Sequence, residues 1–78
     1  MRSLPPLPLE PSPGIYRHYK GQLYRVRCLA RHSETQEVLV IYDALYGDYG
    51  RWVRPQVMFM ETVQVDGFTV PRFTREAD

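Results

Sequence analysis

The side chains best suited to covalent chemistry are Cys28, His18 and His32, because a thiol beside an imidazole can act as a nucleophile with its base. The alternation along residues 22–31 places Cys28 on an apolar face with Val26, where burial raises the pKa of a thiol and leaves it inert. The two histidines are far apart in sequence, and neither has a second ligand nearby at metal spacing. We therefore expect no catalytic residue, no metal site, no cofactor and no enzymatic activity.

A second group of side chains is better suited to binding. Residues 43–55, DALYGDYGRWVRP, gather aromatic rings and arginines around two glycines, and such groups can stack on a ligand and hydrogen-bond to it. The predicted binding residues are Tyr46, Tyr49, Arg51, Trp52 and Arg54, together with His18. Small β-barrels need large interior side chains, so we expect most of the Trp52 ring to face the core, with an edge at the rim. The alternative is an exposed Trp52 that stacks on the ligand.

The basic residues form a block that could be mistaken for a nucleic-acid site. Residues 17–31 hold Arg and Lys but no acid, whereas residues 34–48 hold Asp and Glu but no base. A hairpin would fold the two blocks together, and the charges would neutralise each other. Nucleic acid is therefore an alternative partner that the sequence does not favour, and it would use Arg17, Lys20, Arg25 and Arg27. The formal net charge of +1 points the same way.

The elements that position these side chains read as β-strands. Residues 15–19 form a short strand before a turn at 20–21, and residues 22–31 and 37–44 form long strands joined by a polar loop. One register makes one face wholly apolar and leaves opposite charges paired on the other. It pairs Tyr24 with Ala44, Arg25 with Asp43, Val26 with Tyr42, Arg27 with Ile41, Cys28 with Val40, Leu29 with Leu39, Ala30 with Val38 and Arg31 with Glu37. A register shifted by two residues would keep the faces and change the partners.

The second half of the chain carries two further signals. Pro55 suits the start of a helical turn over residues 55–60, and we expect Met58 or Phe59 to plug the core there. Asp66-Gly67 is a strong hairpin signal, because both residues of a type I′ turn need positive φ. The hairpin would pair Val65 with Phe68, Val63 with Val70 and Glu61 with Arg72. Pro71 cannot donate to a strand ladder, so its strand should be an edge.

These elements predict an all-β domain, a small SH3-like barrel of five or six short antiparallel strands with one helical turn near residues 55–60; a two-layer β-roll is the alternative. With 78 residues the chain has room for one domain, which we place at residues 14–75. Residues 1–13 are proline-rich and should form a flexible, extended arm, with Pro5 and Pro8 at the spacing of a PxxP ligand. Residues 76–78 should be a disordered tail.

Several segments together resemble a small bacterial family, the domain of unknown function DUF1653. They are GIYRHYKGQLYRV, ARHSET, VIYDALYGDYGRWVRP and MFMETV, in this order, over roughly residues 14–75. The resemblance implies a compact, mainly β, single-domain bacterial protein. It implies no activity, and it does not extend to the proline-rich arm.

The sequence favours a non-catalytic module that binds a protein or peptide through an aromatic and arginine rim. Self-association is a further alternative, because Leu29, Leu39 and Ile41 fall on the outward face, where the C-terminal hairpin or a second subunit of a homodimer should cover them. The single cysteine, the absence of a signal peptide and the lack of a long apolar run favour a cytoplasmic protein that does not enter a membrane.

Overall fold

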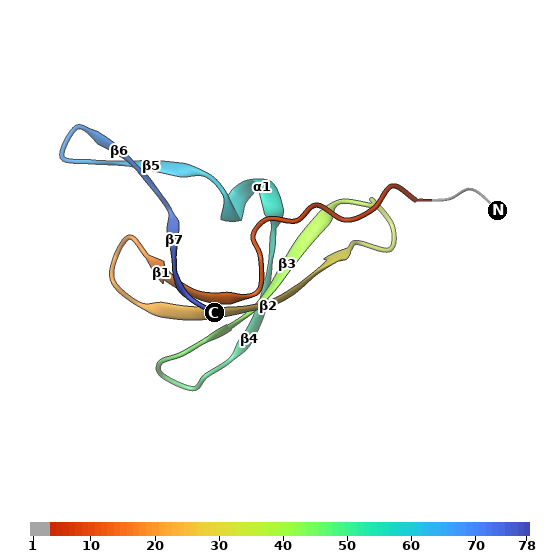
Figure 1. Cartoon of the computed structure of the whole chain (residues 1–78), viewed down its shortest axis with the longest axis horizontal. Helices are drawn as coiled ribbons and strands as arrows, with labels where there is room; N and C mark the ends of the chain where they lie inside the picture. The colour runs from red at the N-terminus through yellow and green to blue at the C-terminus, as the bar shows by residue number, and fades with distance from the viewer. Residues whose placement is uncertain (1–3) are drawn as a thin grey trace.

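The structure, a computed structural model, describes residues 4–78 and is built almost entirely of β-strands (Figure 1). Its elements are β1 (Gly14–His18), β2 (Leu23–Arg31), β3 (Val38–Ala44), β4 (Arg51–Pro55), α1 (Gln56–Phe59), β5 (Thr62–Val65), β6 (Phe68–Pro71) and β7 (Phe73–Ala77). The prediction of an all-β fold with one helical turn within residues 55–60 is confirmed. The helix of residues 56–59 is far too short and too polar at its start to cross a membrane, and it is the one helix in residues 4–78.

The strands do not close into the barrel that we expected. Five of them form one antiparallel sheet in the order β4-β3-β2-β1-β7, while β5 and β6 form a separate two-stranded sheet. In Figure 1 this β5–β6 hairpin projects away from the larger sheet. Because the hairpin leaves the sheet rather than bridging its ends, β4 and β7 remain two separate edges.

The pairing of β2 with β3 follows the predicted register only in its first half. Tyr24 pairs with Ala44, Arg25 with Asp43 and Val26 with Tyr42, as expected. The register then shifts between Val26 and Cys28, so that Cys28 faces Ile41 and Leu29 faces Val40, and the remaining pairs follow the shift. A β-bulge inserts one residue into a strand and reverses which side chains point inward. The predicted burial of Cys28 is therefore wrong: Cys28 is exposed, and Leu29 packs against the core in its place.

The core lies on one face of the five-stranded sheet, which we call the inner face. Its buried side chains come from four of the strands and from α1: Tyr16, Val26, Val40, Tyr42, Phe59 and Phe73. Phe59 is the predicted plug, with 1% of its surface exposed. Its ring stacks on that of Phe73, with 4.0 Å between centroids, and meets the rings of Tyr16 and Tyr42 edge-on. Met58, the other candidate, points away and is exposed.

The C-terminal segment contains the predicted hairpin and then a strand that we did not predict. Asp66 and Gly67 both have positive φ, and the pairs of Val65 with Phe68 and Val63 with Val70 are confirmed. After Arg72 the chain turns back to the larger sheet, where β7 pairs with β1. The expected tail at residues 76–78 is wrong for its first two residues, since β7 continues to Ala77 along an edge of β1 that would otherwise lack a partner.

The proline-rich segment makes specific contacts with the domain over residues 4–13; residues 1–3 of the predicted arm lie outside the described residues. Pro11 is buried, and the backbone oxygen of Ser12 accepts a hydrogen bond of 2.8 Å from the Tyr16 hydroxyl. The carbonyl oxygen of Glu10 accepts one of 2.8 Å from the side chain of Gln56. The segment nearest to β1 is therefore held between the core and α1.

Candidate functional site

Polar and aromatic side chains from three strands and one loop meet beside the core on the inner face. They are His18, Tyr24, Tyr46 and Arg54, and all but Tyr46 lie next to the ring of Phe73. We call these four residues the aromatic rim. The centroids of the His18 and Tyr24 rings lie 5.0 and 5.5 Å from that of Phe73, and the Arg54 Cζ atom lies 5.9 Å from it. Tyr46 joins through Tyr24, with 5.5 Å between their rings.

The strand registers explain why these side chains share a face. Tyr16 pairs with Tyr24 across β1 and β2, and His18 lies two residues beyond Tyr16 on the same side. On β4, Arg54 pairs with the buried Val40, which fixes its side chain on the inner face. Tyr46 comes from the loop after β3, which continues the sheet through a hydrogen bond from Leu45 N–H to a β2 carbonyl.

The two tyrosines of the rim are joined through their hydroxyl groups. The hydroxyl oxygens of Tyr24 and Tyr46 lie 2.8 Å apart, which is hydrogen-bonding distance. Burial, followed by this hydrogen bond, raises the pKa of Tyr24 to about 12. Two hydroxyl groups carry two hydrogens, and the bond between them uses one, which leaves one to be donated outward.

His18 is held as a neutral ring. Its Nδ1 atom accepts a hydrogen bond of 3.2 Å from the Lys20 N–H, so the ring proton of the neutral form lies on Nε2. Burial lowers the pKa of His18, and the positive charges of Arg72, Arg54 and Lys20 lower it further. The rim therefore presents an N–H donor at this position near neutral pH.

Arg54 is the charged group of the rim. Its guanidinium lies beside the Phe73 ring, where a cation is attracted to the π-electrons, and its side chain is half-buried. Within residues 4–78 it forms no ion pair and no hydrogen bond. A planar cation with five unused N–H donors is a natural anchor for an anionic or carbonyl oxygen.

Trp52 lies beside the rim, but not as the sequence predicted. Its partner across β3 and β4 is the buried Tyr42, so its side chain is on the inner face, yet 60% of its surface is exposed. The reason is that β4 is an edge strand and no other element covers it. The indole lies against Gly50, where an added Cβ would be 3.1 Å from the indole Nε1. The expected burial of the ring is therefore wrong, and Trp52 is exposed. That it stacks on a ligand stays a prediction.

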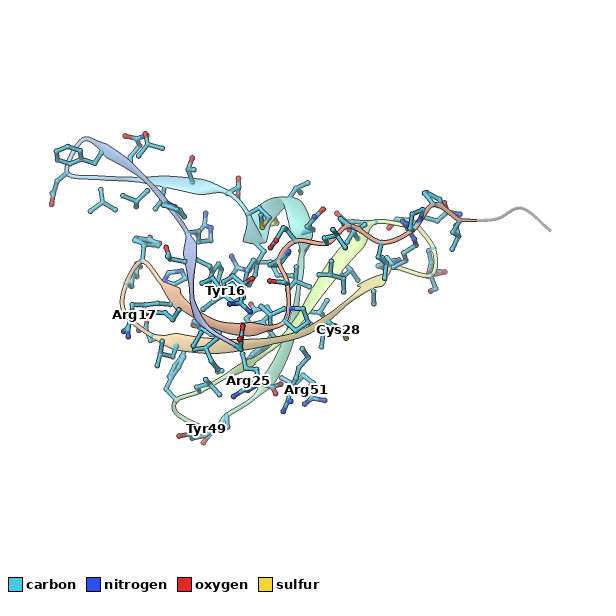
Figure 2. All side chains as sticks on the ribbon, viewed as in Figure 1. Tyr16, Arg17, Arg25, Cys28, Tyr49 and Arg51 are labelled. Atoms are coloured by element: carbon cyan, nitrogen blue, oxygen red, sulfur yellow. The ribbon has the colours of Figure 1, made fainter. Side chains whose placement is uncertain are left out.

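Two of the predicted binding residues lie elsewhere. Tyr49 is exposed at the tip of the loop between β3 and β4, far from Tyr16 in the view of Figure 2. Arg51 pairs with Asp43 across the ladder and lies on the opposite, outer face of the sheet, together with Arg25 (Figure 2). Of the six residues predicted for the site, the fold thus brings His18, Tyr46 and Arg54 together, with Trp52 as a neighbour.

On the outer face two arginines share one carboxylate. Asp43 accepts hydrogen bonds of 2.7 Å from the Nε–H groups of both Arg51 and Arg27. The hydrogen bond from Arg51, followed by that from Arg27, lowers the pKa of Asp43 to about 2. Asp43 was expected to pair with Arg25 or Arg27, and the structure pairs it with Arg27 and also with Arg51.

A groove adjoins the rim on the other side of His18. It has a volume of about 440 Å³ and lies where β1 and β7 meet the base of the β5–β6 hairpin. Its apolar lining comes from the hairpin, and its polar lining includes Arg17 and Glu76, which form an ion pair. His18 belongs to both surfaces.

The sequence did not point to Tyr24, a residue of the rim, or to Phe73, the ring beside which the rim lies. Tyr24 was assigned to the core face, which is correct, but its hydroxyl reaches the edge of the core. Phe73 was read as the end of the hairpin, and only the return of β7 to β1 brings it under the rim. For metals, no cluster of three or more His, Cys, Asp or Glu side chains occurs in the part of the chain described.

Comparison with known proteins gives a consistent result. The chain is similar to the crystal structure of a DUF1653 protein from Bordetella bronchiseptica, with a TM-score of 0.79, 40% sequence identity, and coverage of 87% of this chain and 90% of that one. No curated protein matches it. Residues 14–75 match the family described as a protein of unknown function, DUF1653. This confirms the resemblance read from the sequence, and the chain belongs to the DUF1653 family.

Proposed function

We propose that this protein is a non-catalytic module that recognises another protein, and that it binds a peptide segment at the aromatic rim. The observation that carries the proposal is Arg54, a half-buried arginine beside the Phe73 ring with no ion pair among residues 4–78. Arginine, tyrosine and tryptophan are the residues that contribute most to binding at protein interfaces. All three types meet at this place.

A peptide fits the shape of this region. The rim and the groove meet at His18, so an extended chain could lie across both, with apolar side chains against Val65 and Val70 of the groove. The exposed indole of Trp52 extends the rim along β4. Aromatic surfaces with a few polar groups at fixed positions are typical of sites that bind short segments.

The charges favour a protein over nucleic acid. Arg17 and Arg27, two of the four residues considered for nucleic acid, are engaged with Glu76 and Asp43. Nucleic-acid binding relies on several free cations that neutralise phosphates, and the formal net charge is only +1. The same arrangement supports the absence of catalysis, because Cys28 faces outward and His18 inward, with the sheet between them.

The test is an affinity capture from a bacterial lysate with the full chain as bait, read by mass spectrometry. We expect a specific protein to be captured by the wild type and by Arg51→Gln, and to be lost with Arg54→Gln. Arg51 is the matched control, because it is an arginine of the same strand whose charge is already satisfied. Equal thermal melts of the two variants would show that the fold is intact. Capture of the same protein by Arg54→Gln would contradict the proposed site.

A further inference from the structure

The polar groups of the aromatic rim share one property: they offer hydrogen-bond donors and leave no acidic acceptor. Arg54 has its guanidinium N–H groups, and His18 has its Nε2–H, because its Nδ1 atom already accepts from Lys20. The hydroxyl pair of Tyr24 and Tyr46 uses one hydrogen internally and retains the other. A site with several free donors and no carboxylate is complementary to an anion.

The charges near the rim also favour an anion. The charges that act on His18 are those of Arg72, Arg54 and Lys20, and all are positive. Of these, Arg72 also has an acidic partner, because its Nη2 atom lies 3.6 Å from Oε1 of Glu61. Among the described residues no carboxylate contacts any of the four rim side chains. On the outer face, by contrast, each of Arg27 and Arg51 holds Asp43.

Three of the donor-bearing side chains gather around the ring of Phe73. The His18 and Tyr24 rings and the Arg54 guanidinium all lie within 5.9 Å of the Phe73 centroid, measured to ring centres or to Cζ. Phe73 is itself fixed by stacking on Phe59, so the donors are arranged on a rigid base.

We propose that the aromatic rim binds a carboxylate of its peptide partner, with Arg54 as the charged anchor and His18 and the Tyr24–Tyr46 pair as additional donors. This inference rests on the proposed function and names the chemistry of the ligand. The carboxylate has two sources, an acidic side chain or the C-terminus of the partner. A guanidinium binds a carboxylate through two parallel hydrogen bonds, which gives direction as well as affinity.

The experiment uses the full chain labelled with nitrogen-15 and observed by NMR. The probes are three pools of N-acetylated octapeptides: neutral sequences with a free C-terminus, amidated sequences with one Glu, and amidated neutral sequences. An octamer of deoxythymidine is the fourth probe. The signals followed are the Arg54 Nε–H, the His18 ring and the Tyr46 amide. We expect at least one carboxylate pool to shift the Arg54 Nε–H and to raise the pKa of His18, since an anion offsets the neighbouring positive charges.

The variants establish which charge is responsible. Arg54→Gln should weaken binding of that pool about tenfold to a hundredfold, which is the usual loss for a charged hydrogen bond. Arg54→Lys, which keeps the charge but not the paired donors, should lie between. Arg25→Gln is the matched control, an arginine on the outer face that forms no ion pair in residues 4–78, and it should bind as the wild type does. The two carboxylate pools identify the source.

Three other results would contradict the carboxylate inference, the peptide-binding function or both. If the amidated neutral pool shifts the rim as strongly as the carboxylate pools, the carboxylate inference is wrong, while the peptide-binding function stands. If no peptide pool shifts the rim at millimolar concentration, both are wrong. If the oligonucleotide alone shifts the Arg54 Nε–H, the rim binds an anion of another class, and the protein-binding proposal is overturned. Because these results come from the wild type, they hold even if a variant fails to fold.

Discussion

Both faces of the strand pair β3–β4 carry arginine side chains, but the surroundings of these arginines differ. On the outer face Arg51 and Arg27 both form ion pairs with Asp43, so only one positive charge of this cluster is not balanced. On the inner face Arg54 lies beside an aromatic ring, with no acid in contact among residues 4–78. Arg51 and Arg54 are three residues apart in one strand, so their different surroundings come from the alternation of a strand across the sheet.

The comparison teaches that an arginine becomes a candidate for binding through what surrounds it. A satisfied ion pair at the surface contributes little and leaves nothing for a ligand. An arginine beside an aromatic core, without a partner, keeps its charge and its donors available.

The inner face depends on Phe59, which supports Phe73 under the rim. Phe59→Ala should lower the free energy of unfolding by about 3–5 kcal/mol, the usual cost of emptying a buried phenylalanine site. Chemical denaturation would measure it, and in a domain of this size the variant is expected to be largely unfolded. Met58→Ala, in the same helix but with an exposed side chain, should change stability by less than about 0.5 kcal/mol. Equal effects of the two substitutions would mean that the core is assigned to the wrong residue.

The bulge in β2 decides which of two adjacent residues belongs to the inner face. Leu29→Ala should cost about 1–2 kcal/mol, because Leu29 packs against the core although it is only partly buried. Cys28→Ala should cost less than about 0.5 kcal/mol, and the Cys28 thiol should react with a maleimide in the folded protein. Protection of the thiol, together with a larger cost for Cys28→Ala, would restore the uninterrupted register and reverse the faces beyond Val26.

The outer face can be tested through acid stability. The pKa of Asp43 is lowered in the folded state to about 2, so its carboxylate stabilises the fold above the ordinary value of about 3.8. This contribution is complete above about pH 4 and is lost as the pH falls towards 2. Thermal melts over this range should fall less steeply for Asp43→Asn than for the wild type.

Asp48→Asn is the control for the acid experiment. Asp48 is exposed in the loop between β3 and β4, and among residues 4–78 it forms no ion pair. The slope of its melts against pH should therefore follow that of the wild type. If Asp43→Asn also keeps the wild-type slope, the ion pairs of the outer face are not formed in solution.

The smallest expected effect concerns the tyrosine pair of the rim. Tyr46→Phe removes the hydroxyl that bonds to Tyr24, and the pKa of Tyr24 should fall from about 12 while remaining above the ordinary value of about 10, because burial is its main cause. NMR titration of the Tyr24 ring would follow this change. Tyr49→Phe, at the exposed loop tip, should leave it unaltered, and a shift of equal size would place Tyr49 at the rim.

Much of the fold could be predicted because the local signals agree with the final structure. Asp66-Gly67 specified its own turn through the positive φ of both residues, and Pro55 preceded the helical turn that delivers Phe59. The alternation of residues 22–26 fixed the first three pairs with β3. The family resemblance from residue 14 to 75 was also readable from the sequence.

The errors came from features without a local signature. The bulge at Arg27 adds one residue that no turn or proline announces, and it moved Cys28 outward. The residues after Pro71 look like the end of a hairpin, yet β7 pairs with β1, which is more than fifty residues away in the sequence. The candidate site depended on both kinds of information, since Tyr46 and Arg54 were named from their types, whereas Tyr24 and Phe73 were not.

The sequence by itself determined an all-β domain, its main turns, its helical plug and a concentration of aromatic and arginine residues in one segment. Those properties follow from backbone conformation and from side-chain type, which are local. The tertiary structure alone decided that the sheet stays open, that Arg51 meets an acid and Arg54 does not, and that Trp52 is exposed on an edge strand. The physical reason is that burial and charge pairing depend on neighbours from distant strands, whose register a single bulge can reverse.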